Sequence, residues 1–186
     1  MKSALVLIFV LCTSCGWHFS DSYKTSSNRT LSIPYAQGDG DGLMTAEIIA
    51  QIEKEGSFSY VQDGGHYLLE VVLLDSQSDT LGYRWDPNKL ANGKRKVIPN
   101  ETRRRLLAKV SVLESLSNKV VLGPAYIVGE AEFDHQYYNL NHNINNFSLG
   151  QLTDIDTTYD VVDIPLHRDL ARKIALYLEN HLHDVK

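Results

Sequence analysis

Cys15 is the residue of this chain whose position most directly predicts chemistry. It follows a single basic residue, Lys2, an apolar run over residues 4–11 and two small residues. This order is typical of a secretory signal peptide. Eight apolar residues are too few to span a bilayer, which needs about 20 helical residues. Because a cysteine followed by Gly16 at such a junction resembles the lipobox of signal peptidase II, we predict removal of residues 1–14 and acylation of Cys15.

The chain contains only one other cysteine, Cys12, which lies inside the segment predicted to be removed. A disulfide between Cys12 and Cys15 would close too short a loop to stabilise anything. We therefore predict that the mature domain has neither a disulfide nor a cysteine-based metal site. Gly16, in place of the aspartate that retains enterobacterial lipoproteins in the inner membrane, predicts sorting to the cell outer membrane on its periplasmic side.

A glycine- and aspartate-rich run over residues 38–42 is the next candidate for chemistry, because such runs occur in calcium loops. In the register of an EF-hand loop, the first and twelfth ligand positions would be Gln37 and Ile48, and neither is a carboxylate. The run is better explained as a turn before a helix, with Asp41 placed to interact with the helix N-terminus.

The histidines and nucleophiles of the chain form no recognisable catalytic motif. His135 and His142 lie in a long polar segment, and His181 and His183 lie two residues apart near the end of the chain. None of these spacings matches a zinc protease motif. A nucleophile elbow and a glycine-rich phosphate loop are absent from the sequence as well. We therefore expect no metal, no cofactor and no enzymatic activity.

A basic cluster is the one charged feature with an organised distribution. Most such runs form a solvated surface, but guanidinium and ammonium groups together can also bind phosphate. Tyr83 and Trp85 lie nearby and offer apolar contact to acyl chains. Both interpretations, a solvated face and an anion site, stay open from the residues alone. The cluster consists of Lys89, Lys94, Arg95, Lys96, Arg103, Arg104 and Arg105.

Composition limits the class of protein. The formal net charge is −5, with 43% hydrophobic and 22% charged residues, which is ordinary for a globular domain. The acidic balance argues against a nucleic-acid partner. Residues 15–28 are predicted to form the lipidated cysteine and a flexible tether, because residues 20–28 are rich in Ser, Thr and Asn. Residues 29–186 are then long enough for a single domain.

The pattern of apolar residues predicts two helices and four strands in the order β-α-β-β-β-α. Helical spacing and alternation define these elements, and Pro34 and Pro165 mark the end of the first strand and the start of the last helix. The strands are expected at residues 30–33, 67–75, 102–114 and 119–133, and the helices at 43–54 and, after Pro165, through 170–182. We expect an α+β two-layer sandwich in which both helices pack on one face of a four-stranded sheet.

Two connections carry the predicted functional segments. Residues 134–163 read as a long polar loop that contains no Lys or Arg. Lys94, Arg95 and Lys96 stand between Gly93 and Pro99, so a turn is expected to present them to solvent.

The sequence resembles the LPS-assembly lipoproteins called LptE. The likeness rests on the opening Cys15, Gly16, Trp17 and His18, on the β-α-β-β-β-α order, and on the basic connection that ends near Glu101. Family members carry a basic residue in that connection that is implicated in lipopolysaccharide contact. Counting back from Glu101 without gaps, the resemblance places this position at Arg95, with Lys94 and Lys96 as neighbours.

The resemblance implies a lipid-anchored protein that plugs an LptD-like outer-membrane β-barrel and binds lipopolysaccharide through Arg95, Lys94 and Lys96. A palmitate-type acyl group on Cys15 would supply the membrane contact. The family's second basic position, after the last strand, has no Lys or Arg counterpart here, and His135 and His142 are the only candidates. An alternative is a lipoprotein accessory subunit of another envelope system, such as a lipid-transport ABC system or a cell-wall-synthesis activator.

Overall fold

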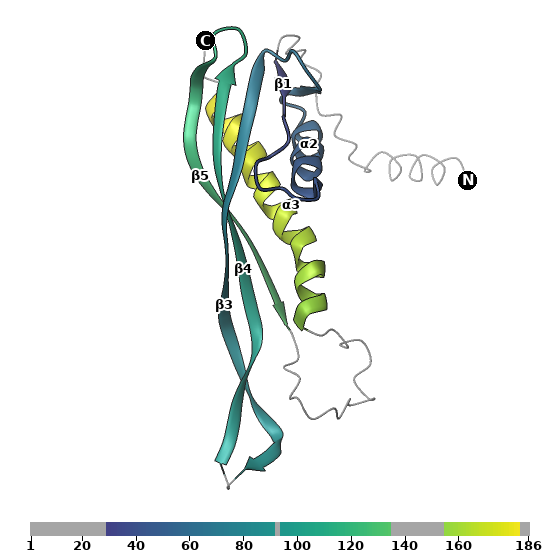
Figure 1. Ribbon diagram of the computed structural model, residues 1–186, viewed down its shortest axis with the longest axis vertical. Helices are drawn as coiled ribbons and strands as arrows, with labels where there is room; N and C mark the ends of the chain where they lie inside the picture. Colours follow the sequence, from purple (N-terminus) through teal and green to yellow (C-terminus); the bar gives the residue numbers. More distant parts are fainter. Residues whose placement is uncertain (1–28, 92–93, 135–154, 183–186) are drawn as a thin grey trace, which may run out of the picture.

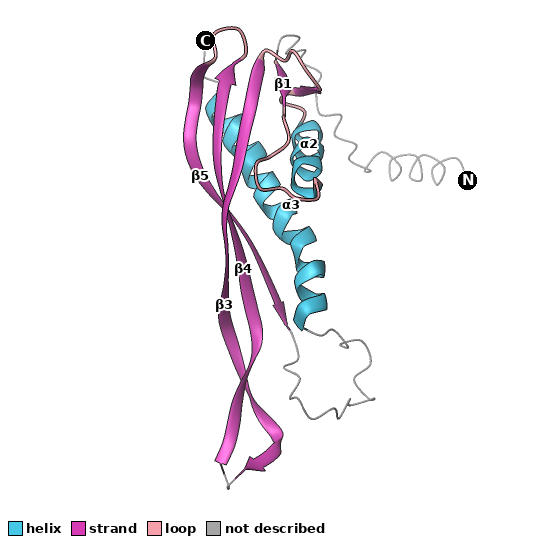
Figure 2. Ribbon diagram, viewed as in Figure 1, coloured by secondary structure: helices cyan, strands magenta, loops and turns pink. Residues whose placement is uncertain are grey.

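The computed structural model describes residues 29–91, 94–134 and 155–182, with the backbone alone for residues 86–91, 94–96 and 155–160 (Figure 1). The elements follow the chain as β1 (Thr30–Ser32), α2 (Leu43–Glu55), β2 (Ser59–Val61), β3 (Tyr67–Ala91), β4 (Lys94–Glu114), β5 (Lys119–Asp134) and α3 (Ile155–Leu182). The strands form one sheet in the order β2-β1-β3-β4-β5. Figure 2 shows α3 passing behind the strands, and α2 packs against α3, so the helices form one layer on the sheet.

The predicted α+β two-layer arrangement is confirmed, with one strand more than expected. β1 pairs in parallel with β2 and β3, while β3, β4 and β5 are antiparallel neighbours. The additional strand, β2, has only three residues. Three residues are too few for alternation to be visible in a sequence, and no proline ends this edge strand as Pro34 follows β1, so it was not predicted.

The hairpin of β3 and β4 is much longer than the sequence suggested. β3 has 25 residues and β4 has 21, and their pairing continues to Leu90 opposite Arg95 and Ala91 opposite Lys94. The expectation that a turn presents Lys94 to Lys96 was therefore wrong, because these residues begin β4 next to the hairpin end. Register shifts between Leu73 and Asp75 and between Trp85 and Leu90 break the alternation that would have revealed the extended strands.

The hairpin of β4 and β5 agrees with the prediction. Glu114 pairs with Lys119, and Asn118 has a φ of 53°. Asn tolerates this left-handed conformation better than most residues because its short polar side chain can hydrogen-bond locally. The tight turn therefore sets the register of the two strands.

The C-terminal helix is longer than predicted, and Pro165 lies inside it. Part of the segment expected to be a loop, residues 155–163, is the first part of α3, while residues 135–154 lie outside the described residues. Pro165 is exposed, whereas Val162 and Leu166 on either side of it are buried. Burial of this stripe offsets the hydrogen bond that proline cannot donate, so the helix continues past it.

The core lies between the helix stripes and the inner face of the sheet. Side chains from β3, β4, α2 and α3 meet there and are almost completely buried. This sandwich depends on apolar residues that alternate along the strands and recur every three or four residues along the helices. Its largest buried side chains include Leu69, Val110, Ile48, Leu170, Ile174 and Leu178.

The glycine-rich run before α2 is a helix cap, as the sequence suggested, although a different carboxylate does most of the capping. The buried Asp39 accepts hydrogen bonds from the backbone N–H of Thr45 at 2.8 Å, from the Thr45 hydroxyl at 2.6 Å and from the N–H of Met44 at 3.3 Å. Asp41 accepts one from Leu43 at 3.1 Å. Burial alone would raise the pKa of Asp39, but the hydrogen bonds from Thr45 and Met44 outweigh it and lower that pKa below its ordinary value.

Candidate functional site

The structure divides the predicted basic cluster into two parts with different surroundings. Arg103, Arg104 and Arg105 lie in the middle of β4, where the strand pairs with both β3 and β5. Lys94, Arg95 and Lys96 are the first three residues of β4, where the strand pairs with β3 alone. Only the second part remains a candidate for binding an external anion.

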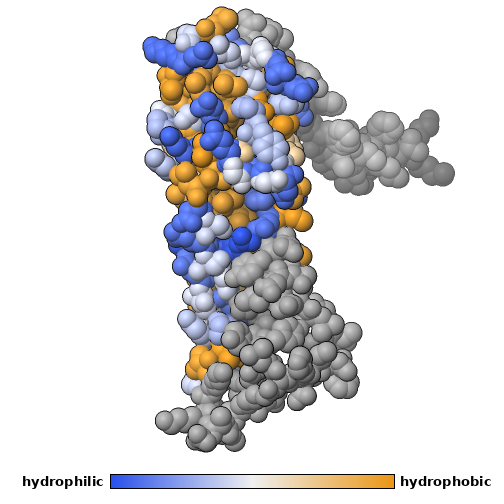
Figure 3. Space-filling view, viewed as in Figure 1, coloured by the Kyte–Doolittle hydropathy of each residue, from blue (hydrophilic) through white to orange (hydrophobic). Residues whose placement is uncertain are grey.

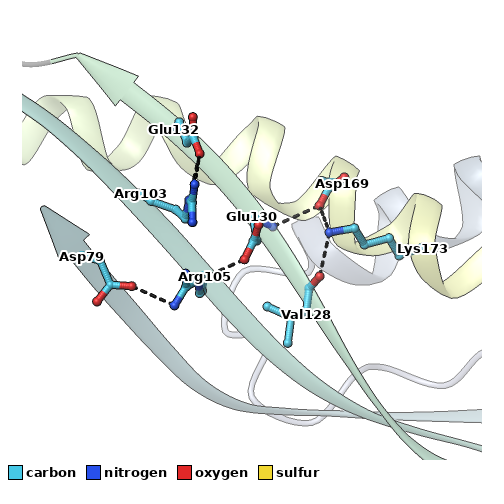
Figure 4. Close-up of polar contacts among 8 residues, drawn as sticks. All are labelled: Asp79, Arg103, Arg105, Val128, Glu130, Glu132, Asp169 and Lys173. Carbon is cyan, nitrogen blue, oxygen red and sulfur yellow. Dashed lines mark hydrogen bonds and ion pairs between the residues drawn. The ribbon is translucent and has the colours of Figure 1, made fainter. Parts of the chain in front are cut away.

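Arg103 and Arg105 are paired with acids across the outer face of the sheet (Figure 4). Arg103 hydrogen-bonds to Glu132 on β5, and these bonds raise the pKa of Arg103. Arg105 bridges β3 and β5, with its Nη1 atom 2.9 Å from Asp79 and its Nε atom 3.0 Å from Glu130. The charges of these arginines are therefore matched by carboxylates of the same sheet.

Arg104 points to the helix side of the sheet instead. Its guanidinium forms an ion pair with Asp163 of α3, and its Nη2 atom lies 3.4 Å from the hydroxyl of Ser76. The pair links β4 to the first half of the C-terminal helix. Asp163 was expected to end a polar loop, so this contact could not be predicted from the sequence.

The remaining cations are concentrated at the far end of the β3–β4 hairpin, which extends beyond both helices (Figure 1). We call residues 84–97 the hairpin tip. It contains five basic residues against one acid, a net charge of +4 in a chain whose total is −5. The basic residues are Arg84, Lys89, Lys94, Arg95 and Lys96, and the acid is Asp86.

Two exposed aromatic residues, Tyr83 and Trp85, lie on one face of the β3–β4 ribbon where the hairpin tip begins. Trp85 pairs with Val97 and Tyr83 pairs with Pro99, so these four residues share a face. Trp85 is 60% exposed, Tyr83 63% and Val97 47%. Ile98, on the opposite face, is only 7% exposed. Ile98 is therefore buried, although Arg84, its partner on the same face, is exposed.

The edge of β5 carries a third polar arrangement, a contact with α3 that we call the edge clamp (Figure 4). Asp169 accepts the backbone N–H of Glu130 at 3.0 Å, and Lys173 donates to the carbonyl oxygen of Val128 at 2.9 Å. Asp169 and Lys173 lie 2.7 Å apart. Together these side chains form hydrogen bonds with the Val128 carbonyl and the Glu130 N–H, the two backbone groups on either side of Gly129 that point away from the sheet. One residue of an added parallel strand would make the same two hydrogen bonds.

The edge clamp requires α3 to approach β5 closely. A Cβ atom at Gly129 would lie 2.6 Å from the Cβ atom of Leu170, which explains why glycine stands at the crossing point. Burial acts to raise the pKa of Asp169, but hydrogen bonds from Lys173, Arg172 and the Glu130 N–H outweigh it and lower that pKa. Unpaired strand edges promote association with other chains, so the edge clamp protects the middle of β5.

The histidines and the cysteine singled out in the sequence lie mostly outside the described part of the chain. No group of His, Cys, Asp and Glu there could hold a metal ion. The Nδ1 atom of His181 lies 2.9 Å from the carbonyl oxygen of Tyr177, four residues earlier in α3. His135, His142 and His183 lie outside the described residues, as does Cys15. The described helices include none that is long and apolar enough to cross a membrane.

Comparisons with known proteins place the fold among bacterial lipoproteins of known structure. No family model matches the sequence, and no curated protein matches it. Rare lipoprotein B from Shewanella oneidensis matches with a TM-score of 0.51 at 9% identity, over 84% of this chain and 98% of that chain. A minor lipoprotein from Acinetobacter baumannii matches with a TM-score of 0.47 at 13% identity, over 81% of this chain and 89% of that chain.

The match to rare lipoprotein B carries the structural argument because it extends over nearly the whole of that protein. At such low identity it establishes the fold and leaves function to be tested. Rare lipoprotein B is LptE, so the resemblance inferred from the sequence is confirmed at the level of the fold: the chain has an LptE-like lipoprotein fold.

Proposed function

We propose that this chain is an outer-membrane lipoprotein that plugs an LptD-like β-barrel and binds lipopolysaccharide during its assembly at the cell surface. The observation that carries the proposal is the shared fold with rare lipoprotein B over 98% of that chain, in a sequence whose residues before Cys15 have the pattern of a signal peptide. Neither observation would suffice alone, because folds host many functions and many lipoproteins have similar leaders.

The shape of the domain is compatible with a plug. One narrow sheet backed by two helices gives a long molecule, and the β3–β4 hairpin extends past the helices (Figure 1). Large β-barrels contain a lumen that a folded domain can occupy, which removes the cost of leaving a wide lumen unsupported. The charge-paired outer face of the sheet offers polar groups to such a wall, through residues such as Arg105 and Glu130.

Co-purification tests the barrel partner. The intact lipoprotein, tagged at its C-terminus, should retain an LptD-like barrel when it is purified from detergent-solubilised envelopes. Depletion of the lipoprotein should lower surface lipopolysaccharide. A complex that contains no barrel, together with normal surface lipopolysaccharide after complete depletion, would favour the accessory-subunit alternative.

Membrane attachment is proposed to occur through an acyl group on Cys15. Cys15→Ser should release the protein from membranes and remove the acyl mass from the purified chain. With Gly16 after the cysteine, sucrose-gradient fractionation should place the parent in the outer membrane. A variant that still sediments with membranes would contradict the lipid anchor, and a parent found in the inner membrane would contradict the sorting.

Lipopolysaccharide is proposed to bind through Lys94, Arg95 and Lys96 at the start of β4. Charge-assisted hydrogen bonds contribute about 1.5–3 kcal/mol each before desolvation and ordering are subtracted, so we expect a roughly micromolar, salt-sensitive affinity. Replacing all three residues by Asp should abolish binding. Arg95→Lys should restore it only in part, because an ammonium group cannot form the bidentate contact of a guanidinium group.

A matched control separates this site from general electrostatics. Replacing Lys54, Lys109 and Lys119 by Asp changes the net charge by the same amount away from the hairpin tip. This control should retain most of the binding. Equal binding by the parent and the tip variant would show that the cluster is a solvated surface.

A further inference from the structure

The turn between β4 and β5 exposes an apolar side chain almost completely. Leu116 is 91% exposed, the largest fraction among the large hydrophobic residues in the described part of the chain. Tight turns are ordinarily built from Gly, Pro, Asn, Asp and Ser, and its neighbours Ser117 and Asn118 follow this rule. Because the side chain of Leu116 packs against almost nothing in the domain, it is available for a contact with another surface.

Three more apolar residues lie close to this turn on the outer face of the sheet. Leu68 pairs with Leu113, which pairs with Val120, so β3, β4 and β5 contribute one residue each. The next residue of β3, Leu69, is buried in the core, so these three side chains point away from the helices. Val120 is 48% exposed, and Figure 3 shows hydrophobic surface at the upper end of the molecule. A group of exposed apolar residues marks a contact surface, whereas one exposed leucine does not. We call Leu68, Leu113, Leu116 and Val120 the turn patch.

The turn patch lies at the end of the domain from which the chain leads back to Cys15. Tyr67, at the start of β3, pairs with Leu31 on β1 and with Glu114 at the end of β4. The first strand therefore begins at the same end of the sheet as the β4–β5 turn (Figure 1). Arg29, the first described residue, follows Cys15 by 14 residues, which span at most roughly 50 Å. A lipid on Cys15 would hold this end of the domain near the membrane surface.

We propose that the turn patch, with Leu116 foremost, contacts the headgroup region of the bilayer that holds the acyl group of Cys15. This inference rests on the proposed membrane attachment and adds to it a second contact, made by the folded domain. A turn at the end of a sheet projects from the domain, so it suits a surface better than a ligand enclosed in a pocket. Lys119, which follows the turn and is exposed, adds attraction to anionic headgroups beside the apolar side chains.

The tether explains why so small a patch is sufficient. A few partly exposed apolar side chains bind a bilayer too weakly to hold a free protein there. A tether raises the effective concentration of the membrane surface around the domain, so a weak contact becomes populated. The acyl group then fixes the distance between domain and membrane, and the turn patch fixes which end of the domain faces the lipid.

A single fluorophore tests this contact. The sequence has no cysteine besides Cys12 and Cys15. The chain from residue 15 onward, with Cys15→Ser and Ser117→Cys, therefore has one thiol, next to Leu116, which is labelled with an environment-sensitive dye. An N-terminal hexahistidine tag attaches this protein to vesicles of phosphatidylethanolamine and phosphatidylglycerol that contain a nickel-chelating lipid, which takes the place of the acyl group.

The expected result is blue-shifted emission of the dye at position 117, and quenching by brominated acyl chains. With Gln77→Cys in place of Ser117→Cys, the dye should show neither effect, because Gln77 is exposed on β3 roughly 30 Å from Leu68. Adding Leu116→Asp should shift the contact about tenfold toward the free domain and remove most of the signal. Leu74→Asp is the matched control, since Leu74 is 49% exposed on β3 away from the turn, and it should leave the signal unchanged.

The outcomes distinguish this inference from the proposed function. Equal signals from positions 117 and 77, or a signal that Leu116→Asp does not reduce, would overturn the membrane contact and leave the lipid anchor intact. A chain whose Cys15 is not acylated in cells would overturn both. A signal that depends on Leu116, in an acylated chain that never co-purifies with a barrel, would support the membrane contact and refute the plug.

Discussion

The edge clamp gives a prediction whose size follows from the structure. Asp169→Ala removes the acceptor of the Glu130 N–H and the ion-pair partner of Arg172 and Lys173. A hydrogen bond to a charged group contributes about 1.5–3 kcal/mol to stability. The ion pairs add little, because Arg172 and Lys173 are well exposed. The side chain of Asp169 is 20% exposed, so we expect a loss of about 2 kcal/mol from the free energy of unfolding.

Thermal and urea unfolding followed by circular dichroism measure this loss. For a domain of this size, 2 kcal/mol corresponds to a decrease in Tm of roughly 4–8 °C. Glu132→Ala is the matched control: Glu132 pairs with Arg103 on the same sheet, but its carboxylate is 50% exposed. This control should lose less than about 0.5 kcal/mol. Equal destabilisation by the two variants would refute the view that Asp169 stabilises the strand edge.

The same residue predicts a dependence on pH. Because the folded state lowers the pKa of Asp169, its contribution is fully present above the unfolded value of about 3.9 and is lost as pH falls through the folded value. Asp169→Asn should therefore be less stable than the parent at neutral pH. The difference between the two proteins should shrink below about pH 4. A constant difference across this range would show that the charge of Asp169 has no part in the effect.

Three further predictions concern folding. Ile174→Asp should prevent the domain from folding, because Ile174 is completely buried and an unpaired buried carboxylate costs several kcal/mol. A thermal melt like that of the parent, followed by circular dichroism, would contradict this position of Ile174 in the core. Gly129→Ala should lower the free energy of unfolding by about 1–3 kcal/mol through its clash with Leu170, whereas Gly40→Ala, which meets nothing within 4 Å, should leave the urea midpoint nearly unchanged. Asp39→Ala should cost about 1–2 kcal/mol by removing the cap of α2, and an unchanged melting temperature would refute that role.

The sequence predicted the layers of the fold because its periodic patterns are strong where packing is simple. Leu106, Ala108, Val110 and Val112 alternate along β4 and are all buried, as the pattern required. The C-terminal stripe through Ile174 packs against this sheet as predicted. These elements bury one continuous face each, so local spacing was sufficient to identify them.

The errors arose where long-range contacts override local signals. Pro165 normally ends a helix, but burial of Val162 and Leu166 carries α3 past it. The far part of the β3–β4 hairpin has register shifts that break the alternation of apolar and polar residues. This part was therefore interpreted as a connection between two shorter strands. Only the pairing of distant residues reveals it as sheet.

The basic residues were visible in the sequence, but their surroundings in the fold were not. Arg103, Arg104 and Arg105 are consecutive in the sequence, and nothing in their spacing indicated that they pair with acids from β3, β5 and α3. Such pairs join residues tens of positions apart, and composition cannot distinguish them from free charges. The aromatic neighbours Tyr83 and Trp85 were noticed, but their common face depends on strand register.

The length of β3 also sets the reach of the molecule. Leu31 pairs with Tyr67 at the first end of β3, so the chain leading back to Cys15 departs from the end opposite the hairpin tip. The 25 residues of β3 span roughly 80 Å at about 3.3 Å per residue. A bilayer with its headgroups is about 40–45 Å thick. The length of β3 therefore exceeds the thickness of a bilayer by roughly 35–40 Å.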